Sequence, residues 1–422
     1  MSTSIEDSPG FRINRNWMQE LDMKPFDFQK ETWQSMENGF SGLVNAPTGY
    51  GKTYSVFLGT VIRFINEHSD DYQKLENSGL QLIWVTPLRA LAKDIARAMK
   101  EALEQLNIPW KIGIRNGDTD NKERQRQKRQ MPEILIITPE SLHLILAQKN
   151  NKEIFRTVKT LAVDEWHELI GSKRGVQVEL AIAAILHAAE SFVQIWGISA
   201  TIGNLEQAME VLLHPLLSSK KSVIIVAKIQ KDIIIESIYP DEIEKYPWAG
   251  HLGIKLAHKI IPIIDKSKTT LIFINTRGMS EMWYQALLDE APHLAGSIAL
   301  HHGSIEQELR IWVEDALHAG KLKAVVCTAS LDLGVDFRPV ETVIQVGSPK
   351  GVARFLQRAG RSGHQPGKSS IIYFLPTHSL ELIEVASLKE AIKENTIESK
   401  EPMILCFDVL IQFMGTMAIG DG

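Results

Sequence analysis

Residues 42–64 read GLVNAPTGYGKTYSVFLGTVIRF, and this stretch decides the fold class. Its first four residues are typical of a short buried strand, and the apolar periodicity of Ser55–Phe64 predicts a helix. The turn between them contains Thr48, Gly49, Gly51, Lys52 and Thr53. Strand, glycine-rich turn and helix in this order are typical of a loop that holds phosphate groups. The stretch therefore predicts a nucleotide-binding domain of the α/β class.

The chemistry of this loop follows from its donors. Backbone N–H groups at a helix start favour phosphate oxygens. Lys52 is expected to reach the β- and γ-phosphates of ATP, and the Thr53 hydroxyl is expected to bind Mg²⁺. Ala46 stands where the general pattern has its first glycine, so this segment alone is also compatible with an ordinary glycine-containing loop.

Two adjacent carboxylates follow a second apolar run. Lys159–Val163 ends in Asp164-Glu165-Trp166-His167. Asp164 is expected to hold Mg²⁺ through water, and Glu165 to orient or deprotonate the attacking water. His167 either relays between ATP and a nucleic-acid face or packs and forms hydrogen bonds.

A third piece, Gln357-Arg358-Ala359-Gly360-Arg361, offers two guanidinium groups to the same phosphates from another domain. An arginine finger typically accelerates phosphoryl transfer by about 10³–10⁵. Arg361 is the first candidate for that role and Arg358 the second, with Gln357 placing water or phosphate. The alternative for Arg358 is a surface ion pair with a helix carboxylate.

Composition limits the other possibilities. The 422 residues predict two or three domains, and a net charge of −5 argues against a protein that coats nucleic acid by bulk attraction. Cys327 and Cys406 form no disulfide framework, which is typical of a reducing compartment. No apolar stretch approaches the ~20 residues of a membrane span, so a cytoplasmic protein is expected.

Apolar runs alternate with helical patterns twice along the chain. The expected strands are Leu80–Thr86, Lys111–Arg115, Ile134–Thr138, Thr160–Asp164 and Gln194–Ser199, then Thr270–Asn275, Gly296–Leu300, Lys323–Thr328, Thr342–Val346 and Ser370–Phe374. This alternation predicts two parallel sheets with helices on both faces. Because Pro215–Ser222 is polar, the first domain is expected to span residues 1–217 and the second residues 218–392.

Residues 393–422 are expected to begin a further domain. Pro402–Met414 predicts a helix that is apolar nearly all round and therefore needs burial on several sides. A truncated chain is the favoured interpretation, and a helix that docks back on the second sheet is the alternative.

Taken together, these motifs resemble superfamily 2 helicases, and most closely the large helicase-related (Lhr) family, including its ligase-associated DExH-box branch. The resemblance runs from about Trp17 to Gly420. It implies two tandem RecA-like, doubly wound parallel-sheet domains, followed by the start of a helical or winged-helix domain. It also implies ATP-dependent unwinding of DNA and 3′-to-5′ translocation on single-stranded DNA in DNA repair, with a repair ligase or nuclease as possible partners.

The same resemblance implies further site residues. Phe26 and Gln29 match the adenine-recognising Q motif, and Asp336 would contact the ribose. Coupling between ATP and nucleic acid would use His167, Ser199 and Thr201. Contacts to nucleic acid would come from Pro87, Arg89, Gly117, Thr138 and Glu140 in the first domain and from Thr276, Arg277, His302, Gly303, Thr328 and Ser330 in the second. His364 replaces the third arginine of many superfamily members, and Trp166 replaces Val or Ile with an expected effect on packing.

Hydroxyl and backbone donors at strand ends suit phosphate oxygens and carry no base information. These donors do not distinguish DNA from RNA or an RNA–DNA hybrid as the bound nucleic acid, because that discrimination depends on contacts to the 2′-hydroxyl. An ATP-gated clamp that closes on nucleic acid without travelling is a further alternative. Trp17 is a candidate for stacking on adenine, and the basic run Lys122–Arg129 is either a solvated helix face or a contact to the DNA backbone.

Overall fold

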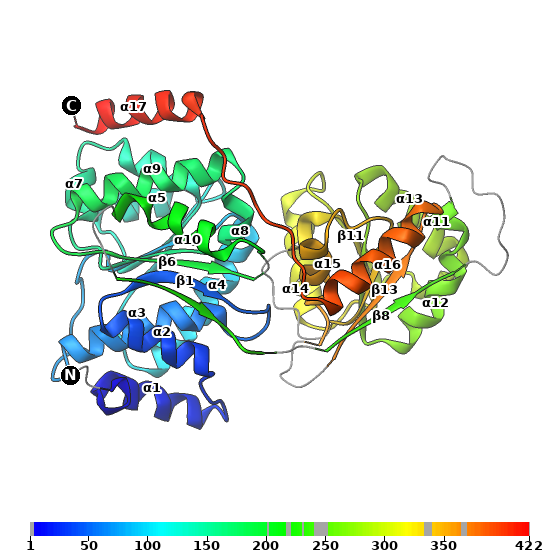
Figure 1. Cartoon of the computed structure of the whole chain (residues 1–422), viewed down its shortest axis with the longest axis horizontal. Helices are drawn as coiled ribbons and strands as arrows, with labels where there is room; N and C mark the ends of the chain where they lie inside the picture. Colours follow the sequence, from blue (N-terminus) through cyan, green and yellow to red (C-terminus); the bar gives the residue numbers. More distant parts are fainter. Residues whose placement is uncertain are drawn as a thin grey trace. The chain divides into compact units, whose positions relative to one another are not determined.

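The computed structural model describes residues 4–200, 202–216, 221–229, 232–239, 252–332, 340–363 and 369–421. They form two compact units (Figure 1). The first unit comprises Met1–Ala46, Gly51–Lys228 and Ser399–Gly422, and the second comprises Pro47–Tyr50 and Ile229–Glu398.

The first unit is built on a seven-stranded parallel sheet with the order β3-β4-β2-β5-β6-β1-β7. The strands are β1 (Ser41–Asn45), β2 (Leu82–Val85), β3 (Ile112–Arg115), β4 (Ile134–Ile137), β5 (Thr160–Val163), β6 (Gln194–Ser199) and β7 (Ser222–Val226). The central strands β2, β4 and β5 are fully buried apolar runs, as expected for parallel strands covered on both faces. Their carboxyl ends meet at one edge of the sheet, where the ends of β1 and β6 also lie.

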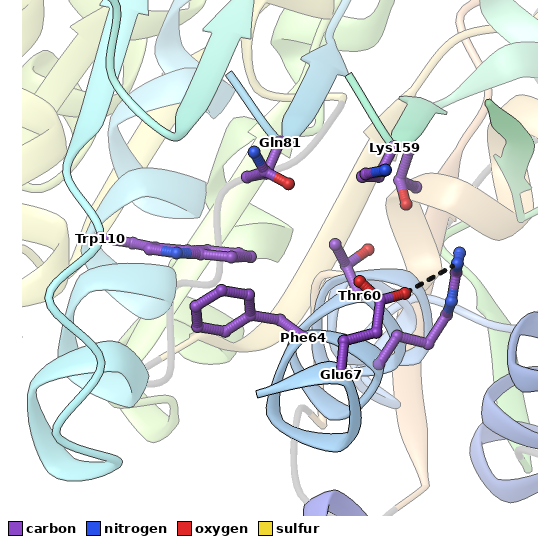
Figure 2. A pocket seen from close by; sticks show the side chains of 8 residues that line it. Thr60, Phe64, Glu67, Gln81, Trp110 and Lys159 are labelled. Atoms are coloured by element: carbon purple, nitrogen blue, oxygen red, sulfur yellow. Dashed lines mark hydrogen bonds and ion pairs between the residues drawn. The ribbon is translucent and has the colours of Figure 1, made fainter. Parts of the chain in front are cut away.

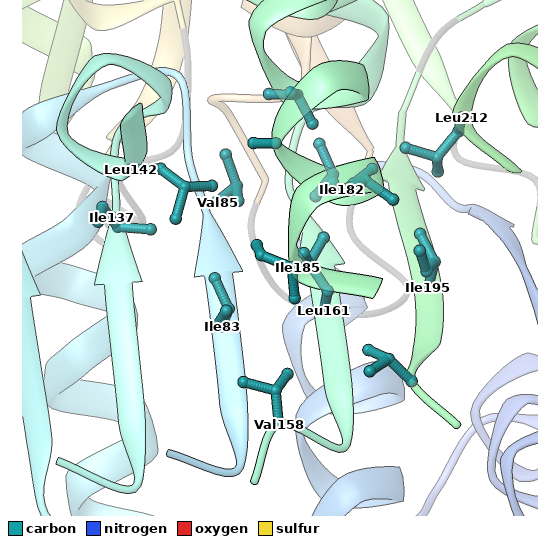
Figure 3. Packing of buried hydrophobic residues seen from close by; sticks show 14 of the residues in the cluster. Ile83, Val85, Ile137, Leu142, Val158, Leu161, Ile182, Ile185, Ile195 and Leu212 are labelled. Atoms are coloured by element: carbon teal, nitrogen blue, oxygen red, sulfur yellow. The ribbon is translucent and has the colours of Figure 1, made fainter. Parts of the chain in front are cut away.

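Helices cover both faces of this sheet. They are α1 (Pro9–Glu20), α2 (Asp27–Glu37), α3 (Lys52–Glu67), α4 (Arg89–Gln105), α5 (Asn121–Arg129), α6 (Pro139–Leu146), α7 (Asn151–Phe155), α8 (Trp166–Leu169), α9 (Lys173–Ala188) and α10 (Leu205–Leu213). Figure 1 shows α2 and α3 on the face opposite α9. On the α9 face, Ile83, Leu161 and Ile195 of the strands pack with Ile182 and Ile185 of α9 (Figure 3).

The second unit repeats this architecture around a six-stranded sheet with the order β10-β11-β9-β12-β13-β8. Its strands are β8 (Ile233–Ser237), β9 (Thr269–Phe273), β10 (Ile298–His301), β11 (Ala324–Cys327), β12 (Val340–Val346) and β13 (Ser370–Leu375). Its helices are α11 (Leu252–Lys255), α12 (Ala257–Lys266), α13 (Arg277–Glu290), α14 (Gln307–His318), α15 (Val352–Ala359) and α16 (Leu380–Lys393). Every pairing in the sheet is parallel.

The predicted fold class is confirmed, because both sheets are parallel and the chain wraps helices around each. Sequence analysis missed β7 and β8. Strand β7 lies beyond the expected boundary at residue 217, yet it pairs with β1, so the first unit extends to Lys228.

The last helix, α17 (Phe407–Asp421), begins later than the expected Pro402–Met414 because Leu405 adopts a left-handed φ of 56°, which is incompatible with a helix. Its Phe413 and Met417 pack on the hydrophobic cluster of the first unit, against α6 and α9. The alternative of docking on the second sheet is therefore wrong. Among the described residues, no helix has the length and hydrophobicity needed to cross a bilayer.

Candidate nucleotide and nucleic-acid sites

The phosphate loop joins the end of β1 at Asn45 to the start of α3 at Lys52. Gly49 and Gly51 have φ values of 89° and 72°, in the left-handed region that glycine adopts without steric cost. These two positions let the backbone turn sharply before α3. The loop therefore lies at the helix N-terminus, where unpaired N–H groups and the helix dipole favour an anion.

Gln29 braces this loop. Its buried side chain donates from Nε2 to the carbonyl oxygen of Gly51 at 3.0 Å, and its Oε1 accepts from the N–H of Phe26 at 2.9 Å. A Cβ at Gly51 would lie 2.8 Å from Gln29 Nε2, so the contact needs glycine there. The geometry gives Gln29 a role in holding the loop. The reading of adenine by Phe26 and Gln29 stays a prediction.

Trp17 is not favoured as an adenine platform. Its side chain is buried, meets the ring of Tyr54 edge-on with centroids 6.0 Å apart, and donates to Gln105 Oε1 at 2.6 Å. Through these contacts the Trp17 ring packs α1 against α3 and α4 within the first unit.

The carboxylate pair lies at the end of β5. Asp164 Oδ1 accepts from the N–H of Glu165 at 3.0 Å, and Trp84 Nε1 lies 3.4 Å from Asp164 Oδ2. Glu165 has a φ of 46°, a left-handed conformation that is uncommon for a residue with a side chain. Strained backbone of this kind is concentrated at functional sites. The conformation turns the chain from the strand end into α8.

Electrostatics at this edge favour a cation. Burial and the neighbouring Glu165 raise the pKa of Asp164 to about 7, against a partly compensating effect of Lys52. A bound cation would favour the ionised carboxylate, so Asp164 fits a Mg²⁺ ligand whose affinity rises with pH. Lys52 Nζ lies 3.9 Å from Glu165 Oε2.

Lys52 also fits a phosphate partner. Its ammonium group is buried and has no hydrogen-bond acceptor in the part of the chain that the structure describes. Burying a charged donor without an acceptor costs free energy unless another group accepts its hydrogen bonds. Phosphate oxygens at the N-terminus of α3 would do so.

His167 connects the carboxylates to β6. Its Nδ1 lies 3.5 Å from Glu165 Oε2 and 3.2 Å from the Ser199 hydroxyl. Burial lowers the pKa of His167, so the neutral imidazole is favoured. The carbonyl oxygen of Ser199 accepts from the N–H of Ala46 at 3.1 Å, which ties β6 to the phosphate loop. Thr201, the other residue predicted to couple ATP to nucleic acid, lies outside the described residues.

Trp166 follows the carboxylates as a core residue. Its side chain is fully buried in the hydrophobic cluster and donates from Nε1 to the carbonyl oxygen of Ala208 at 2.8 Å. The effect of tryptophan on packing, relative to Val or Ile, stays a prediction.

The predicted nucleic-acid residues of the first unit follow three neighbouring strands, β2, β4 and β3. We call this set the first rim; it consists of Pro87, Arg89, Gly117, Thr138 and Glu140. Arg89 Nη1 lies 2.6 Å from Asp118 Oδ1, and Arg174 Nε donates to Glu140 Oε1 at 2.6 Å. Burial alone would raise the pKa of Glu140, but the hydrogen bond and charge of Arg174 lower it. The two charged residues of the first rim, Arg89 and Glu140, are therefore both held in ion pairs.

The second unit has a matching set after its neighbouring strands β9, β10 and β11. We call it the second rim; it consists of Thr276, Arg277, His302, Gly303, Thr328 and Ser330. Thr276 caps α13 by accepting from the N–H of Met279 at 3.3 Å. The Ser330 hydroxyl lies 3.0 Å from the His301 carbonyl oxygen, and His302 Nε2 lies 3.3 Å from Glu281 Oε1. The sheet thus gathers all six residues at one edge.

Arg358 is fully engaged within the second unit. Its side chain is 1% exposed, its Nε and Nη2 donate to the two oxygens of Asp332 at 2.7 and 3.1 Å, and its Nη1 donates to Gln345 Oε1 at 2.6 Å. The guanidinium also lies over the ring of Phe273, with Cζ 4.8 Å from the centroid. The alternative of a surface ion pair for Arg358 is wrong, because this pair is buried.

Gln357 and Arg361 lie beside Arg358 at the end of α15, and both are buried. Asp336 and His364 lie outside the described residues. The sequence alone had assigned no role to Asp332, Gln345, Asp118 or Arg174. Gln345 gave the clearest signal, as an amide side chain between the apolar residues Ile344 and Val346 near the end of β12.

A small cavity lies away from these sites. It is lined by Thr60, Arg63, Phe64, Glu67, Gln81, Trp110, Lys159 and Thr160 (Figure 2). Gln81 and Lys159 directly precede β2 and β5, so the cavity lies at the sheet edge opposite the carboxylates. It encloses about 10 Å³, close to the roughly 10–15 Å³ that one water needs, and is too small for a nucleotide.

Comparisons with known proteins agree with this geometry. The family model for DEAD/DEAH box helicases matches residues 26–208, and that for the helicase conserved C-terminal domain matches residues 254–365. The ATP-dependent helicase Lhr-Core of Methanothermobacter thermautotrophicus is 33% identical over 419 residues, which are 96% of this chain and 48% of that protein. The Lhr helicase/uracil glycosylase of Escherichia coli is 30% identical over 94% of this chain and 29% of its own length.

Among solved structures, the Mycobacterium smegmatis helicase Lhr bound to ssDNA and AMP-PNP superposes with a TM-score of 0.84. It is 30% identical over 96% of this chain and 53% of that chain. Our chain thus spans about half or less of the length of these relatives. It carries both helicase domains, and it belongs to the DEAD/DEAH box helicases, within the Lhr family.

Proposed function

We propose that this chain is the two-domain motor of an ATP-dependent DNA helicase that moves 3′-to-5′ on single-stranded DNA. The observation that carries the proposal is the buried series Lys52, Glu165, His167 and Ser199, which links the phosphate loop to the strand ends. Such a series connects a group that binds phosphate to the sheet edge that carries the first rim. Direction and a role in DNA repair rest on the resemblance to Lhr proteins.

In this proposal Lys52 donates to the β- and γ-phosphates of ATP, and Glu165 accepts the proton of the attacking water. Thr53 and Asp164 would hold Mg²⁺, which neutralises charge on the transferred phosphoryl group. The neutral His167 keeps Glu165 oriented through its Nδ1 side. Arg361 stabilises the transition state. Arg358 acts through Asp332 as a positioning residue, because its donors are already bound there.

The two rims would hold the sugar-phosphate backbone of the strand. Their hydroxyl groups, backbone donors and arginines recognise phosphates, so the motor can step along any sequence. A cytoplasmic location, a repair ligase or nuclease as partner, and a winged-helix domain that begins near residue 393 belong to the same proposal and follow from the resemblance.

Translocation on end-labelled strands tests the proposal. We would measure ATP-dependent displacement of streptavidin from DNA oligonucleotides biotinylated at either end, with Lys52→Ala as control. Faster displacement from the 5′ end would support 3′-to-5′ movement, and faster displacement from the 3′ end would contradict it. DNA-stimulated ATP turnover without displacement from either end would instead support the clamp.

A further inference from the structure

We propose that the Asp118 carboxylate competes with nucleic-acid phosphate for the guanidinium of Arg89, a residue of the first rim. We call the ion pair between Arg89 and Asp118 the latch. The inference rests on the proposed function and names the residue that limits the affinity of that rim. It has a direct consequence: removal of the Asp118 charge should strengthen binding to single-stranded DNA.

The latch is accessible to a ligand. Arg89 Nη1 lies 2.6 Å from Asp118 Oδ1, and the side chains are 58% and 33% exposed, respectively. A guanidinium binds carboxylate and phosphate through the same planar donors. A strand phosphate that reaches the first rim must therefore compete with Asp118 for Arg89.

The loop that carries Asp118 is held in place. The N–H of Asp118 donates to Asn116 Oδ1 at 2.9 Å, and the N–H of Asn116 donates to Thr119 Oγ1 at 2.9 Å. The Thr119 hydroxyl donates in turn to the Ile114 carbonyl oxygen at 3.1 Å. Because the backbone of Asp118 is held next to the end of β3 and the carboxylate is on a short side chain, we infer that the longer Arg89 side chain is the partner that moves when the pair exchanges.

Arg124 braces the same loop from α5. Its Nε donates to the Thr119 carbonyl oxygen at 2.9 Å, and its Nη2 donates to that of Asn116 at 3.3 Å. α5 is in turn tied to β3, since Gln127 Nε2 donates to the Ile114 carbonyl oxygen at 3.1 Å. Arg124 is therefore a positioning residue for the loop, although it belongs to a basic run.

Gly117 provides the surface on which the latch closes. A Cβ at this position would lie 2.5 Å from Arg89 Nη2 and 2.7 Å from Arg89 Cζ. The guanidinium thus packs directly against the backbone of Gly117, and a larger residue would displace it. This contact gives Gly117 a structural role beside its predicted contact with the strand.

The size of the effect follows from the exposure of the pair. Exposed ion pairs contribute about 0.2–1 kcal/mol, so Asp118→Asn should tighten strand binding by about 1.5- to 5-fold. If Arg89 then neutralises one more phosphate, the salt dependence of log K should steepen by up to about 0.7 for a single strand.

A double-mutant cycle separates the latch from a general loss of negative charge. We would measure fluorescence anisotropy of a labelled oligo-dT across a NaCl series for the wild type, Asp118→Asn, Arg89→Ala and the double variant. Glu104→Gln, which removes an exposed carboxylate at the other end of α4, is the matched control. Asp118→Asn should bind the strand more tightly than the wild type. The double variant should bind no more tightly than Arg89→Ala, and Glu104→Gln no more tightly than the wild type.

Equal affinity of Asp118→Asn and the wild type would overturn the latch. So would tightening that persists when Arg89 is absent, because it would reflect net charge alone. A wild-type protein that neither binds the strand nor shows strand-stimulated ATPase would overturn the proposed function itself. If the wild-type protein binds the strand and its ATPase is stimulated, but the double-mutant cycle shows no coupling between Asp118 and Arg89, only the latch is overturned and the proposed function stands.

Discussion

Replacing Asp164 by Asn should make the first unit more stable while it removes ATP turnover. Asp164 is buried at the end of β5, and burial together with the adjacent Glu165 raises its pKa from 3.8 to about 7. A carboxyl with a raised pKa in the folded state binds its proton more tightly there than in the unfolded chain. It therefore costs no stability below pH 3.8 and costs most above about pH 7.

The magnitude follows from that difference. At about 1.4 kcal/mol for each pH unit, the cost of ionised Asp164 at pH 8 is about 4 kcal/mol. Asn keeps one acceptor oxygen for Trp84 Nε1 or the N–H of Glu165 and loses the other bond, at about 1 kcal/mol. The net gain is about 3 kcal/mol at pH 8, or about 6–12 °C in the unfolding transition of the first unit.

Urea unfolding of the wild type and Asp164→Asn, followed at pH 8 and pH 5 without nucleotide, measures this gain. The advantage of the variant should be largest at pH 8 and shrink towards pH 5, and Asp71→Asn on the surface should show no such pattern. A variant that is less stable than the wild type at pH 8 would refute the reasoning. So would an advantage that grows as the pH falls.

Four further outcomes are expected. Glu165→Gln should retain binding of a non-hydrolysable ATP analogue and lose hydrolysis, whereas full ATPase activity would remove Glu165 as the base. Arg361→Ala should lower kcat far more than it weakens ATP binding, while Arg358→Ala should destabilise the second unit by about 3 kcal/mol because it leaves Asp332 buried beside the weaker contact from Arg354. The reverse pattern in stability and kcat measurements would make Arg358 the arginine finger. Residues 1–422 should hydrolyse ATP yet displace a long duplex poorly, because the chain covers 48% of its Lhr-Core relative; efficient displacement in a gel assay would contradict this.

Most strands were predictable because parallel strands buried on both faces appear as continuous apolar runs. β2, β4 and β5 are of this kind. β7 and β8 form the outer strands of their sheets and are only partly buried, so their runs lacked that signal. The start of α17 depends on the left-handed φ of Leu405, and a leucine gives no sequence signal for that conformation.

The residue types of the site were also predictable, since phosphate binding needs glycine, lysine and carboxylates at strand ends. Their partners were not. Arg358 meets Asp332 and Gln345 only because the fold brings α15 close to Gln345 in β12 and to the turn that follows β11. Likewise, Arg89 reaches Asp118 because β2 and β3 both flank β4. Such pairs depend on strand order, which local sequence does not specify.

The strained φ of Glu165 belongs to the same class of feature. Glutamate ordinarily avoids this conformation. It appears only once the strand end, α8 and the buried contacts around it are assembled, so it follows from the whole sheet edge and not from the four-residue motif.

Steady-state ATPase activity tests the central claim most directly. We would compare the chain with no nucleic acid, single-stranded DNA, single-stranded RNA and blunt duplex, with Lys52→Ala as the blank. The account predicts low activity alone and strong stimulation by single-stranded DNA. Equal or greater stimulation by RNA would contradict the DNA track, and high activity with no nucleic acid would contradict a motor coupled to a strand.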